Sequence, residues 1–146
     1  MLSLKHLVLD YNGTLAIDGI PIKKAIDILN TLPDMLTIHI VTADTHSNVR
    51  KHFTNPRFLI SVLGEPKQSQ QKRDYIMKLG AKNTVAIGNG FNDYLMLEKA
   101  AIGIAILQKE GLSCQSLIHA DIVFSSITDA LASLTNPKRL IASLRR

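Results

Sequence analysis

The sequence predicts an α/β protein with a mostly parallel, Rossmann-like sheet in three layers and helices on both faces of the sheet. Short apolar runs alternate along the chain with longer stretches whose apolar residues recur at helical spacing. The short runs are nearly continuous in apolar residues, as is typical of strands buried on both faces. The 146 residues contain no internal repeat and no linker, so we expect a single domain spanning residues 1–146.

The expected strands are short and rich in β-branched or aliphatic residues. The first, His6–Leu9, ends at a polar turn, and the second, Thr37–Thr42, reads TIHIVT. Four more apolar runs complete the set of expected strands, at residues 58–63, 84–87, 102–107 and 121–124. This number of strands is enough for a sheet that can be covered on both sides.

The expected helices lie between these strands. Residues 21–32 carry apolar side chains at positions 22, 25, 26 and 29, which is helical spacing. Asp44 and the polar residues after it offer capping groups for a helix that runs to Phe53, and Gly80 is expected to end a helix over residues 69–79. Further helices are expected over residues 92–101, 111–119 and 127–134, followed by a basic helix that Asn136-Pro137 opens.

Composition and charge exclude several classes of protein. The formal net charge is +5, but the basic residues are scattered in pairs, which disfavours a nucleic-acid partner and suits a phosphorylated one. No apolar run approaches the ~18 residues of a membrane helix, so no membrane partner is expected. The single cysteine, Cys114, and the lack of a signal-peptide pattern lead us to expect a cytoplasmic protein.

Polar residues with chemical potential follow three of the expected strands. The first strand is followed by Asp10-Tyr11-Asn12-Gly13-Thr14, the second ends in Thr42-Ala43-Asp44, and a later one leads into Gly88-Asn89-Gly90-Phe91-Asn92-Asp93. Lys72 lies near the start of the helix that precedes this last strand. Because ligands of such sheets bind outside the carboxyl ends of the strands, these segments predict one shared site.

These four segments resemble the motifs of the haloacid dehalogenase superfamily of phosphatases and phosphotransferases, in the same order and over essentially the whole chain. The most similar pattern is that of the phosphorylation domain of P-type ATPases, with Asp-Lys-Thr-Gly-Thr, Thr-Gly-Asp and Gly-Asp-Gly-x-Asn-Asp loops. The resemblance implies a Mg²⁺-dependent phosphoric monoester hydrolase or phosphotransferase. Its substrate would be a phosphorylated small molecule or a phosphoprotein.

The resemblance also implies roles for individual residues. Asp10 would be the nucleophile that takes up the phosphoryl group. The catalytic residues would be Asp10, Asn12, Thr42 and Lys72. The Mg²⁺ ligands would be Asp10, the backbone carbonyl of Asn12, Asn89 and Asp93. The substrate-binding residues would be Gly13, Thr14, Thr42, Ala43 and Lys72, with backbone N–H groups near Asn12 to Thr14 holding phosphoryl oxygens.

Lys67 is an alternative to Lys72 as the lysine of the site. A helix that begins at the lysine should present apolar residues three, four and seven positions further on. From Lys72 these are Tyr75, Ile76 and Leu79, whereas from Lys67 they are three polar residues. This spacing favours Lys72.

Two residues depart from the family pattern. Asn12 stands where hydrolases of the family carry the aspartate that protonates the leaving group and activates water, and an amide has no proton to exchange. Asn89 stands where the family has an aspartate that binds the metal directly. We therefore expect slow hydrolysis and weak Mg²⁺ binding, or alternatively a non-catalytic relative that binds a phosphorylated ligand or a protein partner.

The stretches between the motifs are too short for a cap domain. Residues 15–41 and 43–71 are each taken up by expected core elements. An uncapped site is open to water, which a large substrate or a second subunit would have to exclude. A homo-oligomer is therefore expected.

Overall fold

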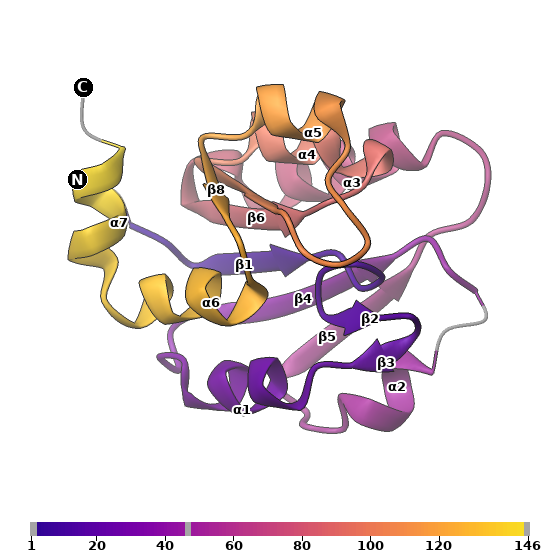
Figure 1. The fold of residues 1–146 in the computed structure, drawn as a ribbon, viewed down its shortest axis with the longest axis horizontal. Helices are drawn as coiled ribbons and strands as arrows, with labels where there is room; N and C mark the ends of the chain where they lie inside the picture. Colours follow the sequence, from indigo (N-terminus) through magenta and orange to yellow (C-terminus); the bar gives the residue numbers. More distant parts are fainter. Residues whose placement is uncertain (1–2, 46–47, 145–146) are drawn as a thin grey trace.

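The protein is described by a computed structural model that covers residues 3–45 and 48–144. Its centre is a six-stranded parallel sheet with the order β5-β4-β1-β6-β7-β8 (Figure 1). The strands are β1 (His6–Leu9), β4 (Thr37–Thr42), β5 (Phe58–Val62), β6 (Thr84–Gly88), β7 (Ile102–Ile106) and β8 (Ile122–Phe124). The predicted parallel α/β sheet is confirmed, and each expected strand is present within one residue at either end.

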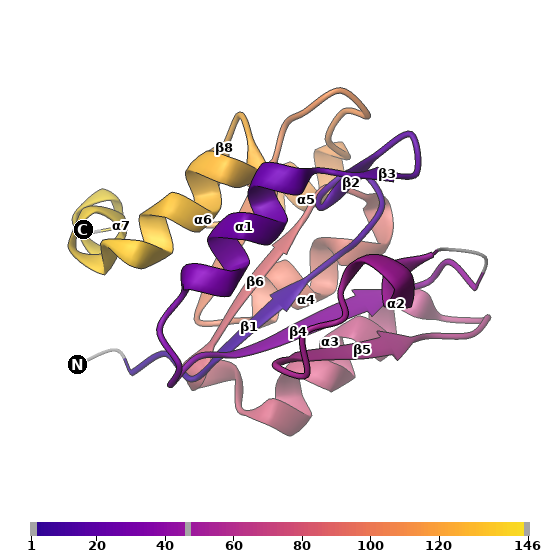
Figure 2. The same cartoon turned by 90° about the horizontal axis from the view of Figure 1, so that it is seen from below.

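Helices cover both faces of the sheet, as the sequence predicts (Figures 1 and 2). One face is covered by α1 (Lys23–Thr31), α2 (Val49–His52) and α6 (Ile127–Thr135). The other face is covered by α3 (Gln68–Leu79), α4 (Tyr94–Lys99) and α5 (Cys114–His119). The last helix, α7 (Pro137–Ser143), packs beside α6.

The alternation of side chains along each strand divides the core in two. On β1, Leu7 and Leu9 join the core that α1 and α6 cover, while Val8 joins the core beneath α3 and α4. All three side chains are fully buried. A strand with water on neither face has few positions for polar residues, which explains the nearly continuous apolar runs of the sequence.

A small hairpin follows the first motif and was missed in the sequence. Its strands, β2 (Ala16–Ile17) and β3 (Ile20–Pro21), pair antiparallel on either side of Asp18-Gly19. Both turn residues have positive φ, 52° and 76°, as the tight turn of a two-residue hairpin requires. An Asp-Gly pair between apolar residues is the signal that could have revealed this hairpin.

Three details of the expected helices differ, the first being that the helix expected over residues 111–119 begins only at Cys114. The helix after β4 begins only at Val49, behind Asn48, so the predicted capping role of Asp44 is wrong, and its carboxylate instead accepts a hydrogen bond from Asn12. The helix expected over residues 92–101 starts with a 3-10 turn, Phe91–Asp93, before α4. The end of α3 at Leu79 is confirmed, with Gly80 at a φ of 105°. Within the described ranges, no helix is long and apolar enough to cross a membrane.

A row of three aromatic side chains lies between the sheet and α3. The His39 ring is only 3% exposed and lies between the Tyr75 hydroxyl, 2.7 Å from Nδ1, and the His6 ring, 3.1 Å from Nε2. Burial, with a smaller effect of His6, lowers the pKa of His39 from 6.5 to about 4. The folded protein therefore holds His39 neutral at a pH at which an exposed histidine is charged.

We expect acid to destabilise the fold through His39. The unfolded chain takes up a proton as pH falls through about 6.5, but the folded protein does so only near pH 4. Stability contributed by neutral His39 is therefore complete above pH 6.5, and up to about 3 kcal/mol is lost as pH falls to 4. Urea unfolding across this range should show the loss. The loss should be read as the difference between the wild-type protein and His39→Gln, because protonation of Asp10, whose pKa is raised to about 7, stabilises the fold over the same range. His52→Gln, an exposed control, should match the wild-type protein, and a difference from His39→Gln that is the same at pH 7 and pH 4 would contradict the assignment.

Candidate active site

A cavity of about 570 Å³ opens at the carboxyl edge of the sheet, where the predicted motifs meet. Asp10 follows the central strand β1, Thr42 ends the neighbouring β4, and Asn89 follows β6 on the other side of β1. The strand order thus brings together three segments that are far apart in the sequence. The cavity is lined by Asp10, Asn12, Thr42, Ala43, Asp44, Glu65, Gln68, Asn89, Gly90, Phe91, Asn92 and Glu110.

Beneath the cavity lies a buried cluster of two carboxylates around one ammonium group. Lys72 Nζ is 2.9 Å from Asp10 Oδ1 and 2.7 Å from Asp93 Oδ1, and it also donates to Asn92 Oδ1 at 3.1 Å. Lys72 and Asp93 are fully buried, and Asp10 is 7% exposed at the floor of the cavity. All three N–H donors of the ammonium group are therefore satisfied by oxygen atoms of the protein.

The charges of this cluster do not cancel, since two carboxylates surround one ammonium group. Burial and the neighbouring Asp93 carboxylate raise the pKa of Asp10 to about 7, although Lys72 acts in the opposite direction. Burial lowers the pKa of Lys72, but the two carboxylates outweigh it and hold that pKa above its ordinary value. When Asp10 is ionised, the cluster therefore carries an excess negative charge that a cation would neutralise.

The choice between the two lysines agrees with this geometry. Lys72 is the lysine whose ammonium group contacts Asp10, and Ile76, one helical turn further on, is fully buried against the sheet. Lys67 instead lies at the N-terminal boundary of α3, is exposed, and has a φ of 63°.

Asn89 joins the loop after β6 to the first motif. Its Oδ1 lies 3.3 Å from the Thr14 hydroxyl, which is also 3.4 Å from Asp10 Oδ2. Its Nδ2 donates to the carbonyl oxygen of Gly111 at 3.2 Å, a bond that an aspartate could not make. A Cβ on Gly13 would overlap the Asn89 amide, and the φ of 82° at Gly13 also requires glycine. The amide at position 89 thus has a structural reason.

Two predicted phosphate-binding residues do not face the cavity. The N–H of Gly13 donates to the carbonyl oxygen of Ala16, and the N–H of Thr14 donates to that of Tyr11. Neither residue lines the cavity, because the chain turns back here to start the hairpin. The expectation that these two N–H groups hold phosphoryl oxygens is therefore wrong, whereas Thr42 and Ala43 do line the cavity.

Asn12 is held by the segment after β4. Its Nδ2 donates to Asp44 Oδ2 at 3.0 Å, and the N–H of Asp44 donates to the Thr42 hydroxyl at 3.1 Å. Both Asn12 and Asp44 line the cavity. The side chain at position 12 is therefore an amide that is anchored to a neighbouring carboxylate.

Asp93 lies beneath the surface of the cavity and supports it. Its Oδ2 accepts the N–H groups of Asn89 and Gly90, at 3.1 and 2.9 Å, while Oδ1 accepts from Lys72. A Cβ on Gly88 would overlap this carboxylate, so the loop closes tightly around it. Asp93 thus positions Asn89, and a cation at the cavity floor would meet Asp10 and Asn89 before Asp93.

The oxygen atoms at the cavity floor suit a hard divalent cation such as Mg²⁺, which prefers oxygen ligands and needs few carboxylates from the protein. Asp10 Oδ2, the Asn89 amide oxygen and the Asn12 backbone carbonyl are of the right type. In residues 3–45 and 48–144, no three His, Cys, Asp or Glu side chains gather as metal ligands. A cation held here would depend on amide and backbone oxygens as well as carboxylates.

Gln108 is a residue of the site that sequence reasoning missed. Its Nε2 donates to the carbonyl oxygens of both Gly13 and Thr14 at 3.1 Å, and its Oε1 accepts the N–H of Ile127 at 2.8 Å. One half-buried amide thus fixes the turn of the first motif to the loop after β7. No local sequence pattern marks this residue, since its partners are backbone groups far along the chain.

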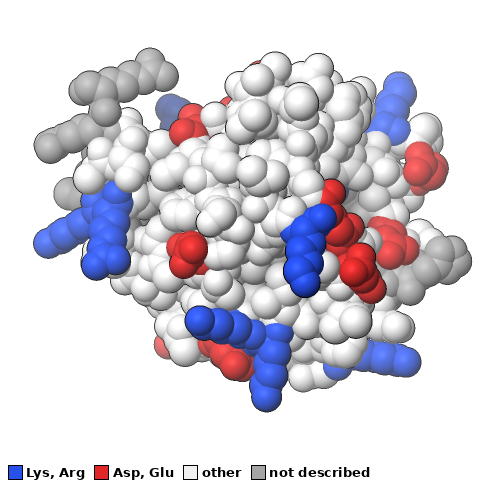
Figure 3. Space-filling view, viewed as in Figure 1, with Lys and Arg blue, Asp and Glu red and all other residues white. Residues whose placement is uncertain are grey.

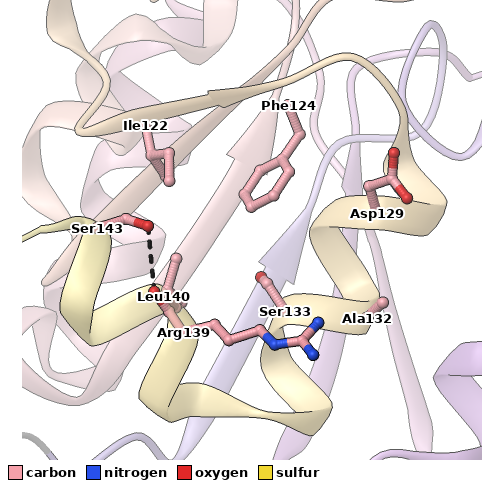
Figure 4. Close-up of a pocket in the computed structure, with 8 residues that line it drawn as sticks. All are labelled: Ile122, Phe124, Asp129, Ala132, Ser133, Arg139, Leu140 and Ser143. Atoms are coloured by element: carbon pink, nitrogen blue, oxygen red, sulfur yellow. Dashed lines mark hydrogen bonds between the residues drawn. The ribbon is translucent and has the colours of Figure 1, made fainter.

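A second cavity, of about 290 Å³, lies between β8, α6 and α7 (Figure 4). Ile122 and Phe124 of β8 face Leu140 of α7 across it, with Asp129 and Arg139 at its margins. It lacks the paired carboxylates and the buried lysine of the first cavity.

Solved structures share this fold. A 3-deoxy-D-manno-octulosonate 8-phosphate phosphatase of Moraxella catarrhalis, crystallised with a magnesium ion, a phosphate ion and KDO, superposes with a TM-score of 0.68 at 15% identity, covering 97% of this chain and 94% of that one. The cobalt-bound phosphatase of the same substrate from Haemophilus influenzae gives 0.65 at 13% identity, covering 92% and 90%. A hydrolase of Streptomyces avermitilis assigned to the HAD family gives 0.68 at 16%, covering 94% and 88%.

The chain thus has the fold of haloacid dehalogenase superfamily hydrolases. No protein-family model matches the sequence. The chain belongs to the same family as an uncharacterised protein of Methanocaldococcus jannaschii, with which it is 44% identical over 64 residues, 44% of this chain and 69% of that protein.

Removing the buried ammonium group should destabilise the protein and make its stability depend on Mg²⁺. In Lys72→Met, Asp10 and Asp93 lose the ammonium group between them, and breaking a buried ion pair in this way costs about 3–5 kcal/mol. Urea unfolding with and without millimolar Mg²⁺ measures both effects. Mg²⁺ should stabilise the variant more than the wild type, whereas Lys67→Met should resemble the wild type. A loss below about 1 kcal/mol would contradict this role of Lys72.

Proposed function

We propose that this protein is a phosphoric monoester hydrolase or phosphotransferase that acts through an aspartyl phosphate on Asp10. The observation that supports it most is the position of Asp10, a carboxylate at the floor of an open cavity with the Lys72 ammonium group 2.9 Å away. A carboxylate kept at the end of a buried strand beside a fixed cation is an activated nucleophile rather than a solvated surface group. The fold, shared with phosphatases, agrees with this proposal.

In the first step, Asp10 attacks phosphorus and the bond between phosphorus and the leaving oxygen breaks. The leaving oxygen takes its proton from water, because Asn12 has none to give. In the second step, water attacks the phosphoryl group, which releases inorganic phosphate and the Asp10 carboxylate. Lys72 favours the ionised, reactive form of Asp10, while Thr42 and Ala43 border the space for the phosphoryl oxygens.

We propose Mg²⁺ as the cofactor, held by Asp10, Asn89 and the backbone carbonyl of Asn12 and supported by Asp93. When bound, it would supply positive charge that offsets the repulsion between a carboxylate and a phosphate dianion. The excess negative charge beneath the cavity supports this assignment, since a cation bound there would be paired with a carboxylate that Lys72 does not neutralise. With an amide at position 89, the site carries one negative charge fewer than an all-aspartate site and should bind Mg²⁺ weakly.

Hydrolysis of the phosphoenzyme should be the slow step. General acid–base catalysis commonly contributes about 10²–10⁴-fold, and Asn12 cannot supply it. We propose that the chain is a soluble, uncapped relative of the phosphorylation domain of P-type ATPases, whose loops its motifs resemble. A cytoplasmic homo-oligomer acting on a small molecule or a phosphoprotein fits this proposal, since a second subunit or a large substrate could shield the open cavity.

A second candidate function is supported by the two amides. Asn12 and Asn89 each occupy a position where the family has an acid, and each makes hydrogen bonds that hold the site together. A protein that binds phosphate without cleaving an ester would keep such a framework. It differs from the first candidate in that no phosphate becomes covalently attached.

Acetyl phosphate with Mg²⁺ should label Asp10. We expect acid-stable, hydroxylamine-sensitive phosphorylation of the wild-type protein, accumulating faster than phosphate is released, because the second step lacks an acid–base group. Asp10→Asn should remove the label entirely, and Asp18→Asn, an exposed control in the hairpin turn, should keep it. A folded wild-type protein that binds phosphate and Mg²⁺ but takes no label would favour the binding function instead.

Exchanging the amide of Asn12 and the carboxylate of Asp44 should accelerate hydrolysis of the phosphoenzyme. Asn12→Asp alone would place two carboxylates about 3 Å apart, which repel each other. The double variant Asn12→Asp with Asp44→Asn keeps an amide-to-carboxylate hydrogen bond and adds an acid–base group at position 12. We expect dephosphorylation at least tenfold faster than in the wild type, measured by chase of labelled protein. Asp44→Asn alone serves as the control, and a double variant no faster than this control would refute the role of position 12.

A further inference from the structure

We propose, building on the proposed function, that the substrate is a phosphomonoester whose leaving group carries an ammonium group. The chemistry of the cavity mouth supports this. Asp44, Glu65 and Glu110 line the cavity, and no Lys, Arg or His is found among its described lining residues. The phosphoryl group would lie at the floor beside Asp10, so the leaving group would meet the mouth.

The three carboxylates come from three different loops. Asp44 follows β4, Glu65 lies between β5 and α3, and Glu110 lies between β7 and α5. Because β5 and β7 are on opposite sides of the central strand β1, Glu65 and Glu110 flank the Asp10 site from both sides. A leaving group extending from the floor would therefore pass between negative charges whichever side it leans towards.

Among the described residues that line the cavity, no basic side chain pairs with these carboxylates. Lys72, which lies against Asp10, is fully buried and already surrounded by acceptors. The net charge of +5 is therefore located elsewhere on the surface, and the expectation that a mild positive field attracts the substrate does not hold at the cavity mouth. In Figure 3, acidic side chains gather on the right, the side towards which the strands of Figure 1 point, with a basic side chain directly beside them and further basic side chains spread around the rest of this face.

One exposed aromatic ring completes the mouth. Phe91 lines the cavity and is 59% exposed, although large apolar side chains are usually covered. The face of an aromatic ring attracts an ammonium group, and carboxylates around it strengthen that preference. Phe91 begins the 3-10 turn that carries Asp93, so the position of its backbone is fixed by the same loop that supports the floor.

The side chain of Glu110 is also held in place. Its Oε2 accepts the N–H of Asp18 in the hairpin turn at 3.1 Å, which ties the β7–α5 loop to the hairpin. Glu65 and Glu110 are exposed, so water and salt weaken their fields, and each should alter affinity only several-fold. Together they should give about a tenfold preference for an ammonium group over a carboxylate.

The test uses three sugar phosphates of similar size that differ in charge: glucosamine 6-phosphate, glucose 6-phosphate and 6-phosphogluconate. A cavity of about 570 Å³ has room for any of them. With Mg²⁺ at low salt, we expect kcat/KM to fall in this order, by about tenfold from first to last. The difference in kcat/KM between the three esters should become smaller at 0.5 M salt, since the carboxylates are exposed and salt screens them.

Variants identify the groups responsible. Glu65→Gln and Glu110→Gln should each reduce the difference in kcat/KM between the three esters several-fold. Glutamine at position 110 keeps an acceptor for the N–H of Asp18. Glu98→Gln removes an exposed carboxylate on α4 outside the cavity and should leave this difference unchanged. Equal rates for all three esters, or a preference for 6-phosphogluconate, would overturn the inference.

Labelling by acetyl phosphate separates this inference from the proposed function. Acetyl phosphate releases only acetate, a small leaving group without an ammonium group. Its labelling therefore reports on Asp10 and not on the charges at the cavity mouth. Labelling without the expected charge order overturns the inference alone. If Asp10 takes no label, the proposed function fails and the inference fails with it.

Discussion

The buried pairing of Lys72 with Asp10 and Asp93 is the constraint on which the rest of the site depends. A lysine with no exposed surface is tolerated only when its charge is paired and its three donors are satisfied. Asp10 at the end of β1 and Asp93 after β6 meet both needs, and they draw α3 onto the edge of the sheet. The charge cluster thereby aligns two loops and a helix, together with hydrogen bonds such as the one from Thr14 to Asn89.

Most of the fold follows from patterns that are local in the sequence. The apolar runs of β1 and β4 predict strands because burial on both faces requires apolar residues there. The glycine after α3 predicts the end of that helix because a positive φ favours glycine. The Asp18-Gly19 hairpin also left such a trace, and it was overlooked. The late start of α2 was not predictable in this way, because Asp44 is a good capping residue whose carboxylate is used by Asn12 instead.

The site was predictable in its residues but less so in their arrangement. Motif order identified Asp10, Thr42 and Lys72, and helical spacing chose Lys72 over Lys67. It could not show that the Gly13 and Thr14 N–H groups are consumed within a turn, since those bonds depend on the backbone path. Nor could it find Gln108, which acts through three backbone groups and has no motif of its own.

Gln108 also has a consequence for how the protein is made. It joins carbonyl groups 94 and 95 residues earlier in the chain to the N–H of Ile127, which comes 19 residues later. During synthesis the first motif therefore emerges from the ribosome long before the groups that fix its turn. A nascent chain must complete β7, β8 and the start of α6 before Gln108 can hold the turn that follows Asp10, so a fragment that ends before Ile127 lacks one anchor of the first motif.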